Sequence, residues 1–235
     1  MQLKGILFDK DGTLINFEET FGPSTERVLR ELSGGQEDKF LKMAEAWLFD
    51  PETLRFSPFS VAVGATTLEM AEAIAPFIAA DDLQKLSIQL DRMYGDYCNQ
   101  CVVSLPKTVP ALEGLRKMGF KLGIATNDAE FNALSQMQQL GIDHMFDLIM
   151  GADSGHGGKP GGGMVANFAR FVGCDPLHIA MVGDSVHDME SGKNAGSRTI
   201  GVETGPAARQ ELEGHCDMVL GSIAEIEQHA ILAVD

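Results

Sequence analysis

The sequence predicts an α/β protein in which a parallel sheet with covering helices is interrupted by an inserted helical segment. After Pro106, short apolar runs bounded by turns alternate with helical stretches, a pattern typical of βαβ units. Between about Phe17 and Gln100, apolar residues instead recur at helical spacing. The apolar run Ile6–Phe8 therefore belongs with the C-terminal part, and the helical segment is inserted directly after it.

The first strand delivers two carboxylates, Asp9 and Asp11, followed by Gly12. Side chains two residues apart face the same way along a strand, so both carboxylates can converge on one site. Gly12 lets the backbone turn sharply just after them. Such a pair can hold a hard cation, or one carboxylate can attack an electrophile while the other moves a proton.

The inserted segment is expected to hold four helices, which are separated by prolines and by a Gly-Gly pair. Their apolar residues lie at helical spacing, which indicates core packing. The predicted ranges are Ser24–Leu32, Glu37–Phe49, Ala65–Ile74 and Asp81–Cys98, with Pro23, Pro51, Pro58 and Pro76 as breaks. Cys98-x-x-Cys101 has no partner Cys or His at metal-ligand spacing, so we interpret it as structural thiols.

The C-terminal part is expected to alternate between helices and strands. The predicted helices are Thr108–Met118, Ala129–Leu140, Met164–Phe171, Met189–Ala195, Ala207–Leu212 and Ile223–His229. The predicted strands are Lys121–Ala125, Leu148–Met150, His178–Val182, Thr199–Val202 and Met218–Leu220. Ligands bind beyond the carboxyl ends of the strands in open parallel sheets, so the site is expected at Asp9 and Asp11.

Two later segments suit a phosphate group. Thr126 and Asn127 end the second strand, where a hydroxyl and nearby N–H groups can bind a phosphate oxygen. An ordinary strand-to-helix turn capped by Asn127 or Asp128 also explains them. Lys159 lies in a Gly-rich loop, where it can neutralise a transferring phosphoryl group or be an ordinary solvated lysine.

A third segment ends an apolar strand with Gly183 and Asp184. Asp188 follows one helical turn later and can orient the first carboxylate or a metal-bound water. His187 lies on a different face of that helix, and we interpret it as a surface residue.

The charge of the chain limits its partners. The formal net charge is −16, with 34 acidic and 18 basic residues. Nucleic acid and anionic membrane surfaces both need clustered positive charge, so neither is expected as a broad partner. Met1 leads directly into a strand without a signal-peptide pattern, and the apolar runs are too short for a membrane span. We therefore expect a cytoplasmic protein.

Taken in order, these motifs resemble the haloacid dehalogenase superfamily of phosphohydrolases, over essentially the whole chain. The motifs are Asp9-x-Asp11-Gly12-Thr13, Thr126, Lys159 and Gly183-Asp184-Ser185-x-x-Asp188. The resemblance implies a three-layer Rossmann-like parallel-sheet core of residues 1–16 and 101–235, and an all-helical C1-type cap of residues 17–100. Within the superfamily the chain is most similar to the phosphoglycolate phosphatase group, where Phe59–Glu69, with Val63-Gly64-Ala65, is similar to the cap segment that faces the substrate.

The resemblance also implies a Mg²⁺-dependent phosphatase that hydrolyses a small phosphoglycolate-like phosphomonoester through an aspartyl-phosphate. Asp9 would be the nucleophile, and Asp11 would protonate the leaving alcohol and then deprotonate water. Mg²⁺ would be held by Asp9, the main-chain carbonyl of Asp11 and Asp184, with Asp188 in a supporting second shell. The groups implied to bind the phosphoryl oxygens are Thr126, the Asn127 amide and Lys159.

The sequence also bears on functions other than phosphoester hydrolysis. Asp11 argues against dehalogenation, since dehalogenating members lack an acid there. Thr13 fits phosphatases better than sugar phosphomutases, which remain an alternative, as does a non-catalytic phosphate-binding protein. Arg55 could pair with a substrate carboxylate or second phosphate, or be an exposed arginine. The sequence allows a monomer or a homodimer.

One segment departs from the family pattern. Relatives usually follow the motif Lys-Pro with a second Pro and an acidic residue, whereas here Gly161–Gly163 follow Pro160. Each glycine costs about 1 kcal/mol inside a helix, so the helix is expected to begin at Met164. The loop is expected to be too glycine-rich to pack well, and we hypothesise that it orders when phosphate binds Lys159.

Overall fold

A computed structural model describes residues 3–57, 59–63, 65–205 and 207–229. The chain divides into two compact units. One combines Met1–Asn16 with Ser104–Asp235, and the other is Phe17–Val103. The expectation that the second unit is a cap domain stays a prediction. Pro58 and Gly64, which the sequence analysis named, lie outside the described residues.

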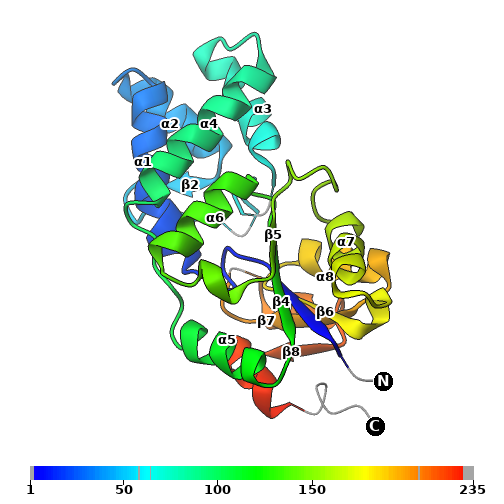
Figure 1. Ribbon diagram of the computed structural model, residues 1–235. Helices are drawn as coiled ribbons and strands as arrows, with labels where there is room; N and C mark the ends of the chain where they lie inside the picture. The colour runs from blue at the N-terminus through cyan, green and yellow to red at the C-terminus, as the bar shows by residue number, and fades with distance from the viewer. Residues whose placement is uncertain (1–2, 58, 64, 206, 230–235) are drawn as a thin grey trace. The chain divides into compact units, whose positions relative to one another are not determined.

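Within its described residues, the first unit holds a six-stranded parallel sheet in the order β5-β4-β1-β6-β7-β8 (Figure 1). The strands are β1 (Gly5–Phe8), β4 (Lys121–Ala125), β5 (Leu148–Met150), β6 (Ile179–Gly183), β7 (Arg198–Val202) and β8 (Met218–Leu220). From β1 the chain adds β4 and β5 on one side and then β6 to β8 on the other. This reversal of strand order is the position where parallel sheets bind ligands, beyond the carboxyl ends of the strands.

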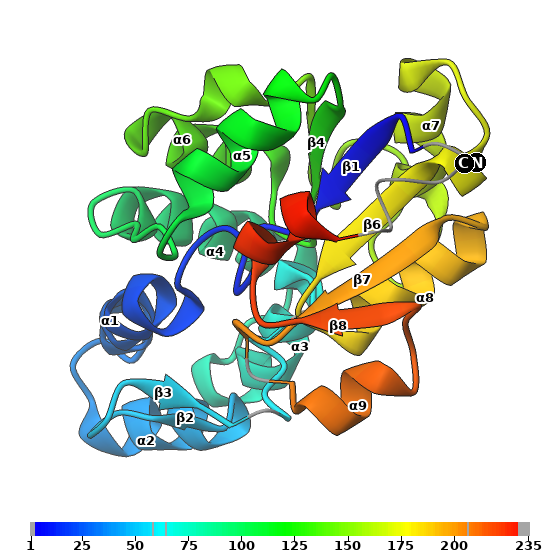
Figure 2. The same ribbon diagram turned by 90° about the horizontal axis from the view of Figure 1, so that it is seen from below.

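Helices cover both faces of this sheet, which confirms the predicted three-layer α/β fold. Figures 1 and 2 show α7 and α8 on one side and α5 and α6 on the other. The helices of this unit are α5 (Thr108–Lys117), α6 (Glu130–Gln139), α7 (Gly163–Val172), α8 (Val186–Ala195) and α9 (Arg209–Glu213), with 3₁₀ turns η1 (Asp143–Met145), η2 (Pro176–His178) and η3 (Ile223–Gln228). Ile223–His229, predicted as a helix, is thus a 3₁₀ turn.

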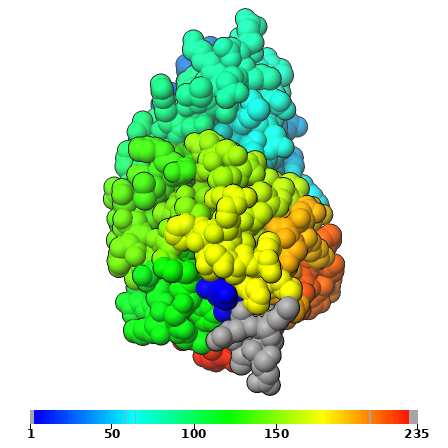
Figure 3. All heavy atoms as spheres, turned by 45° about the vertical axis from the view of Figure 1, so that its right-hand side comes forward, coloured from blue at the N-terminus to red at the C-terminus, as the bar shows by residue number. Residues whose placement is uncertain are grey.

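The central strand is buried along its whole length. All four residues of β1 are buried, and the space-filling view shows only a small blue patch of the N-terminal segment between its green and yellow neighbours (Figure 3). Phe168 of α7 packs onto this part of the sheet. A Cβ atom on Gly5 or Gly123 would lie 2.9 or 2.7 Å from its ring, so glycine at both positions lets the ring approach closely.

The second unit packs four helices around a core centred on Trp47, whose Nε1 donates to the Met70 carbonyl at 3.0 Å. Its elements are α1 (Phe17–Leu32), α2 (Glu37–Ala46), β2 (Phe49–Asp50), β3 (Arg55–Phe56), α3 (Thr67–Ile78) and α4 (Leu83–Cys98). None of the described helices combines the length and apolarity that a membrane crossing requires.

The prediction of an all-helical insertion is wrong in one place, because β2 and β3 form a short antiparallel hairpin. The helix predicted to reach Phe49 ends at Ala46, and Leu48 then adopts a left-handed φ of 49°. Phe49 and Phe56 face each other across the hairpin with ring centroids 4.9 Å apart. An aromatic cross-strand pair of this kind stabilises two strands that are too short to persist alone.

Two helices also run through prolines that were expected to break them. α1 begins at Phe17 and contains Pro23, and α3 continues past Pro76 to Ile78. A proline inside a helix removes one hydrogen bond and costs about 3 kcal/mol. The apolar side chains that these helices bury, such as Phe17 and Ile74, compensate for that loss.

Candidate active site

Asp9 lies directly after β1, at the carboxyl edge of the sheet. Its N–H donates to the Val182 carbonyl at 2.7 Å, so the backbone pairing of β1 with β6 extends to this residue. The Asp9 carboxylate is buried. Its position is therefore fixed by the sheet itself and not by a flexible loop.

Asp184 follows the neighbouring strand β6 and is enclosed by the turn after Asp9. The Thr13 hydroxyl donates to its Oδ1 at 3.0 Å. Gly12 has a φ of 80°, and a Cβ atom there would lie 2.5 Å from Asp184 Oδ2. A Cβ atom on Gly205 would lie only 1.7 Å from the same oxygen. Any side chain at either glycine would displace this carboxylate.

Asp188 is held by the start of α8, where it forms a capping box with Ser185. Its Oδ2 accepts from the Ser185 hydroxyl at 2.6 Å and from the Ser185 N–H at 3.1 Å. These bonds explain why the helix begins at Val186, three residues earlier than predicted, because a capping box satisfies the first N–H groups of a helix. Oδ1 of Asp188 is left to face the site.

The ammonium group of Lys159 bridges two of these acids. Its Nζ donates to Oδ1 of Asp9 at 2.5 Å and to Oδ1 of Asp188 at 2.6 Å. The side-chain amide of Asn127, at the end of β4, holds the backbone of Lys159 on both sides. Its Oδ1 accepts from the Lys159 N–H at 2.7 Å, and its Nδ2 donates to the Lys159 carbonyl at 3.0 Å. Sequence reasoning missed this positioning contact.

The C-terminal part of the glycine-rich loop around Lys159 is closely packed, so the expectation that the loop packs poorly is wrong for that part. The Lys159–Pro160 peptide is cis. The Pro160 and Gly161 carbonyls accept from Asn194 Nδ2 at 2.9 Å and from the Ser191 hydroxyl at 2.8 Å. α7 starts one residue before Met164, at Gly163, where a Cβ atom would lie 2.0 Å from the His156 carbonyl oxygen. Gly162 and Gly163 permit close packing that side chains would prevent.

Three buried carboxylates gather around one ammonium group. Among the residues that the structure describes, Asp9, Asp184 and Asp188 offer oxygens that all lie within 4.8 Å of one another. If ionised, three acids and one lysine leave two uncompensated negative charges. This donor set of oxygens alone, short of positive charge, fits a hard divalent cation such as Mg²⁺.

The electrostatics of the cluster follow from burial and crowding. Burial raises the pKa of Asp9 to about 7, with Lys159 opposing the shift and Asp188 adding to it. Burial and the nearby Asp9 carboxylate also raise the pKa of Asp184 well above its ordinary range. Burial alone would lower the pKa of Lys159, but Asp188 and Asp9 outweigh it and raise that pKa. The lysine is thus cationic, while Asp9 and Asp184 resist ionisation.

Asp11 takes a different partner from Asp9. Its Oδ1 accepts from Nζ of the preceding residue, Lys10, at 2.7 Å, and its side chain is 20% exposed. Asp11 is not among the three carboxylates of the cluster. Burial raises the pKa of Asp11, against the opposing charge of Lys10, which favours a carboxyl that keeps a proton. The role expected for its main-chain carbonyl stays a prediction.

Lys10 is fully buried and was missed by sequence reasoning. Its Nζ also donates to Gln136 Oε1 at 2.6 Å and pairs with Asp128 Oδ2 at 3.1 Å. Asp128 accepts from the Ala129 N–H at 2.7 Å through its other oxygen. The predicted capping of α6 by Asn127 or Asp128 is wrong, since Ala129 occupies the cap position. Asn127 instead binds the backbone of Lys159, and Asp128 pairs with Lys10.

The remaining predicted residues lie as follows. Thr126 is buried, and its hydroxyl accepts from the Asp128 N–H at 3.1 Å. His187 is exposed, as predicted, and Arg55 is exposed on β3. The cysteines, all within the described residues, form no disulfide. Cys101 Sγ lies 3.3 Å from the Ser24 hydroxyl, consistent with a structural thiol.

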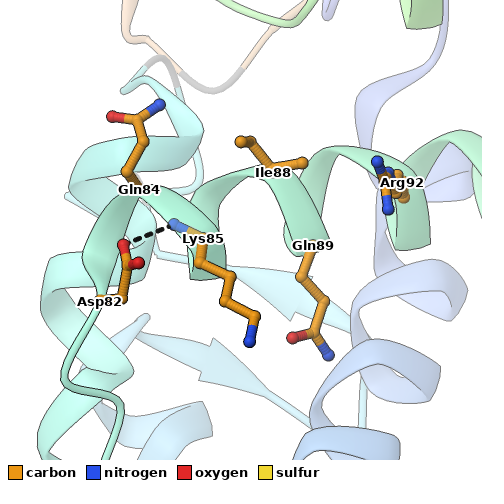
Figure 4. A pocket seen from close by; sticks show the side chains of 6 residues that line it. All are labelled: Asp82, Gln84, Lys85, Ile88, Gln89 and Arg92. Carbon is orange, nitrogen blue, oxygen red and sulfur yellow. Dashed lines mark hydrogen bonds between the residues drawn. The ribbon is translucent and has the colours of Figure 1, made fainter.

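A surface hollow in the second unit lies along α4 (Figure 4). All of its lining side chains come from this one helix and the residue that caps it, and Asp82 Oδ1 accepts the Lys85 N–H at 2.9 Å. Figure 4 shows these side chains spreading apart from the helix instead of converging on one point. The hollow has none of the convergent chemistry found around Asp9.

Comparison with known proteins gives consistent results. A model of the haloacid dehalogenase-like hydrolase family matches residues 3–196. A pyrophosphatase PpaX from Bacillus pumilus is 31% identical over 198 residues, covering 84% of this chain and 82% of the relative. A phosphoglycolate phosphatase from Neisseria meningitidis is 26% identical, covering 97% and 93%. The crystal structure of a haloacid dehalogenase-like hydrolase from Bacteroides fragilis matches with a TM-score of 0.73 at 24% identity, covering 96% and 100%.

Proposed function

The chain belongs to the haloacid dehalogenase-like hydrolase family, and from that premise we propose that it is a Mg²⁺-dependent phosphatase acting on a small phosphorylated metabolite. The observation that carries the proposal is the buried cluster of Asp9, Asp184 and Asp188 around Lys159. Phosphoryl transfer depends mainly on positioning and charge neutralisation. A rigid group of carboxylates and one ammonium at a strand switch point supplies both.

We assign the bond-forming role to Asp9. One of its carboxylate oxygens attacks phosphorus, the bond from phosphorus to the leaving oxygen breaks, and Asp11 gives that oxygen a proton. Water then attacks the aspartyl-phosphate and passes a proton to Asp11, which releases phosphate and restores both acids. The proximity of Asp11 to β1 and its raised pKa support the proton-donor role.

The same acids would hold Mg²⁺. Asp9, Asp184 and Asp188 are the candidate side-chain ligands, with the Asp11 carbonyl as a fourth. When bound, the ion would supply positive charge to the phosphoryl oxygens and offset the charge that the acid cluster leaves uncompensated. Asp188, which the sequence assigned to a supporting position, is here a candidate direct ligand. Thr126, the Asn127 N–H and Lys159 are the candidate phosphate-binding groups.

Two substrate classes are favoured by the relatives. Phosphoglycolate-like monoesters are suggested by the Neisseria meningitidis relative, which covers nearly the whole chain, and pyrophosphate by the more identical Bacillus pumilus relative. The first would leave as an alkoxide that needs a proton, whereas the second leaves as phosphate. Arg55, exposed on β3, is a candidate for recognising a second anionic group of either substrate.

The remaining predictions complete the proposal. The helical unit, Phe17–Val103, would act as the substrate-selecting cap domain. The enzyme would act in the cytoplasm, as a monomer or homodimer, on a free small molecule. The strongly negative net charge, −16, supports the expectation that nucleic acid and anionic membranes are not its partners.

The test is phosphate release from phosphoglycolate, sugar phosphates, nucleotides and pyrophosphate, with Mg²⁺ or with EDTA. We expect metal-dependent release for the wild type and a loss of about 10³-fold or more for Asp9→Asn, because the amide is a poor nucleophile. His187→Ala, on the exposed face of α8, is the matched control and should retain wild-type rates.

The panel also separates the alternatives. Release from one compound class assigns the substrate, and the ratio of phosphoglycolate to pyrophosphate turnover decides between the two relatives. Conversion of a sugar phosphate into its isomer without free phosphate would identify a phosphomutase. Binding of inorganic phosphate with no turnover of any compound would leave a non-catalytic phosphate-binding protein.

A further inference from the structure

We propose that Lys10, with Asp128 and Gln136, is a positioning device that holds the carboxyl group of Asp11 in place for proton exchange with the leaving group. The inference rests on the proposed function, because it gives Asp11 a partner in that reaction. Its residues lie outside the cluster around Lys159. They fall on the turn after β1 and on the start and inner face of α6.

The ammonium group of Lys10 is surrounded by three acceptors. Asp11 Oδ1 lies at 2.7 Å, Gln136 Oε1 at 2.6 Å and Asp128 Oδ2 at 3.1 Å. The lysine side chain is 0% exposed, and Gln136 is also fully buried. Two hydrogen bonds and one ion pair hold the lysine head from three sides, which restricts its position. It can therefore restrain Asp11 in a way that a solvated lysine cannot.

The acceptors are themselves held by α6. Asp128 Oδ1 accepts from the Ala129 N–H at 2.7 Å and from Asn132 Nδ2 at 3.0 Å. Asn132 and Gln136 lie one turn apart on the same face of α6, and Asp128 lies just before the helix, where Asn132 binds it. This face is polar although it is buried. The polar side chains on this buried face are explained if they bind the ammonium group of Lys10.

The backbone of Lys10 also organises the turn that follows Asp11. Its carbonyl accepts from the Leu14 N–H at 2.9 Å and from the Ile15 N–H at 3.1 Å. One residue thus fixes both the loop that carries Asp11 and the Asp11 carboxyl itself. Since Lys10 engages Oδ1, the geometry leaves Oδ2 to exchange the proton. The partly exposed side chain of Asp11 is consistent with access by substrate.

The experiment compares leaving groups. Lys10→Met keeps an unbranched side chain of similar length and removes the ammonium, and Lys42→Met, at an exposed position on α2, is the matched control. kcat/KM would be measured with p-nitrophenyl phosphate, whose leaving group needs little protonation, and with glycerol phosphate, whose leaving alkoxide needs a proton. Inhibition by inorganic phosphate would report on the phosphate site.

We expect Lys10→Met to lower kcat/KM for glycerol phosphate by about 10²-fold and for p-nitrophenyl phosphate by no more than about fivefold. The inhibition constant of inorganic phosphate should stay within about twofold of wild type. Equal losses with both substrates, or a weakened phosphate site, would overturn the positioning role. Absence of any phosphate release by the wild type would instead reject the proposed function.

A second variant keeps the proposal testable if Lys10→Met fails to fold. Lys10→Met leaves the partly buried carboxylates of Asp11 and Asp128 without their shared cation, which is destabilising. Lys10→Met/Asp128→Asn removes one of those charges and should fold, as judged by its unfolding transition. It should keep the same selective loss with glycerol phosphate. Recovery of the wild-type ratio between the two substrates in this variant would contradict the proposal.

Discussion

Two buried lysines follow the same plan with different surroundings. Lys159 pairs with Asp9 and Asp188 beside a third acid, Asp184, whereas Lys10 pairs with Asp11 and Asp128 and completes its contacts with a neutral amide. The first cluster carries three acids for one cation and the second carries two. The first is therefore short of positive charge and suited to accept a metal ion and a phosphoryl group, while the second is nearly balanced and suited to hold a fixed geometry.

The largest effect should come from removing the cation of the first cluster. Lys159→Met is expected to lower the rate of phosphate release by about 10²- to 10³-fold, because a preorganised positive charge on the phosphoryl group is lost. Steady-state kinetics on the best substrate would measure it. A rate of phosphate release by Lys159→Met within fivefold of wild type would contradict the proposed difference between Lys159 and Lys10.

The next effect concerns stability and the second cluster. Lys10→Met should lower the free energy of unfolding by about 3 kcal/mol, since it leaves two partly buried carboxylates without their cation. The double variant Lys10→Met/Asp128→Asn should recover part of that loss. Urea denaturation followed by circular dichroism would provide both values. A stable Lys10→Met protein would mean that the cluster is solvated in solution.

Metal should stabilise only the cluster that lacks positive charge. Mg²⁺ at about 100 times its Kd is expected to raise the free energy of unfolding by about 2.7 kcal/mol relative to EDTA. Asp184→Asn should abolish most of this gain, while Lys10→Met/Asp128→Asn should keep it. Thermal unfolding with and without Mg²⁺ measures the effect independently of activity. An equal gain in all three proteins would place the ion elsewhere.

Per pH unit, the smallest expected effect is a pH dependence of the metal-free protein. Burial raises the pKa of Asp9 from 3.8 to about 7, so the folded state binds more protons than the unfolded state between these values. The contribution of Asp9 to stability is present at low pH and is lost as pH rises through about 7, by at most about 1.4 kcal/mol per pH unit.

Asp9→Asn should flatten this dependence, although Asp184, whose pKa is also raised, keeps part of the slope. Urea midpoints between pH 4 and pH 8 in EDTA would measure both proteins. Stability that rises with pH across this range in the wild type, relative to Asp9→Asn, would contradict the expected sign.

The sheet and the first cluster could be predicted because both depend on local patterns. Lys121–Ala125, Leu148–Met150 and Met218–Leu220 are strands with the predicted bounds, since buried parallel strands are short apolar runs between turns. Asp9 and Asp184 follow strands, Lys159 lies in the loop before α7 and Asp188 lies in the first turn of α8, and the parallel topology brings these residues together.

The second cluster could not be predicted in the same way. A lysine between two aspartates is ordinarily solvated, and Lys10 is buried only because α6 offers polar partners more than 110 residues later. One signal was available. Asp128, Asn132 and Gln136 form a polar row at helical spacing, but a polar row is usually an exposed face. Only the packing of α6 shows that this one is buried.

The central position of β1 also affects how the protein is made. The strand that leads to Asp9 leaves the ribosome before its sheet neighbours β4 and β6, which begin only at Lys121 and Ile179. At ~5–20 residues per second, β1 waits roughly 5 to 25 s for its first neighbour and roughly 10 to 35 s for its second. Until β4 is made, this apolar strand has both backbone edges unpaired, and until β6 is made it still has one unpaired edge. Translation speed and chaperone supply are therefore expected to affect the yield of active enzyme.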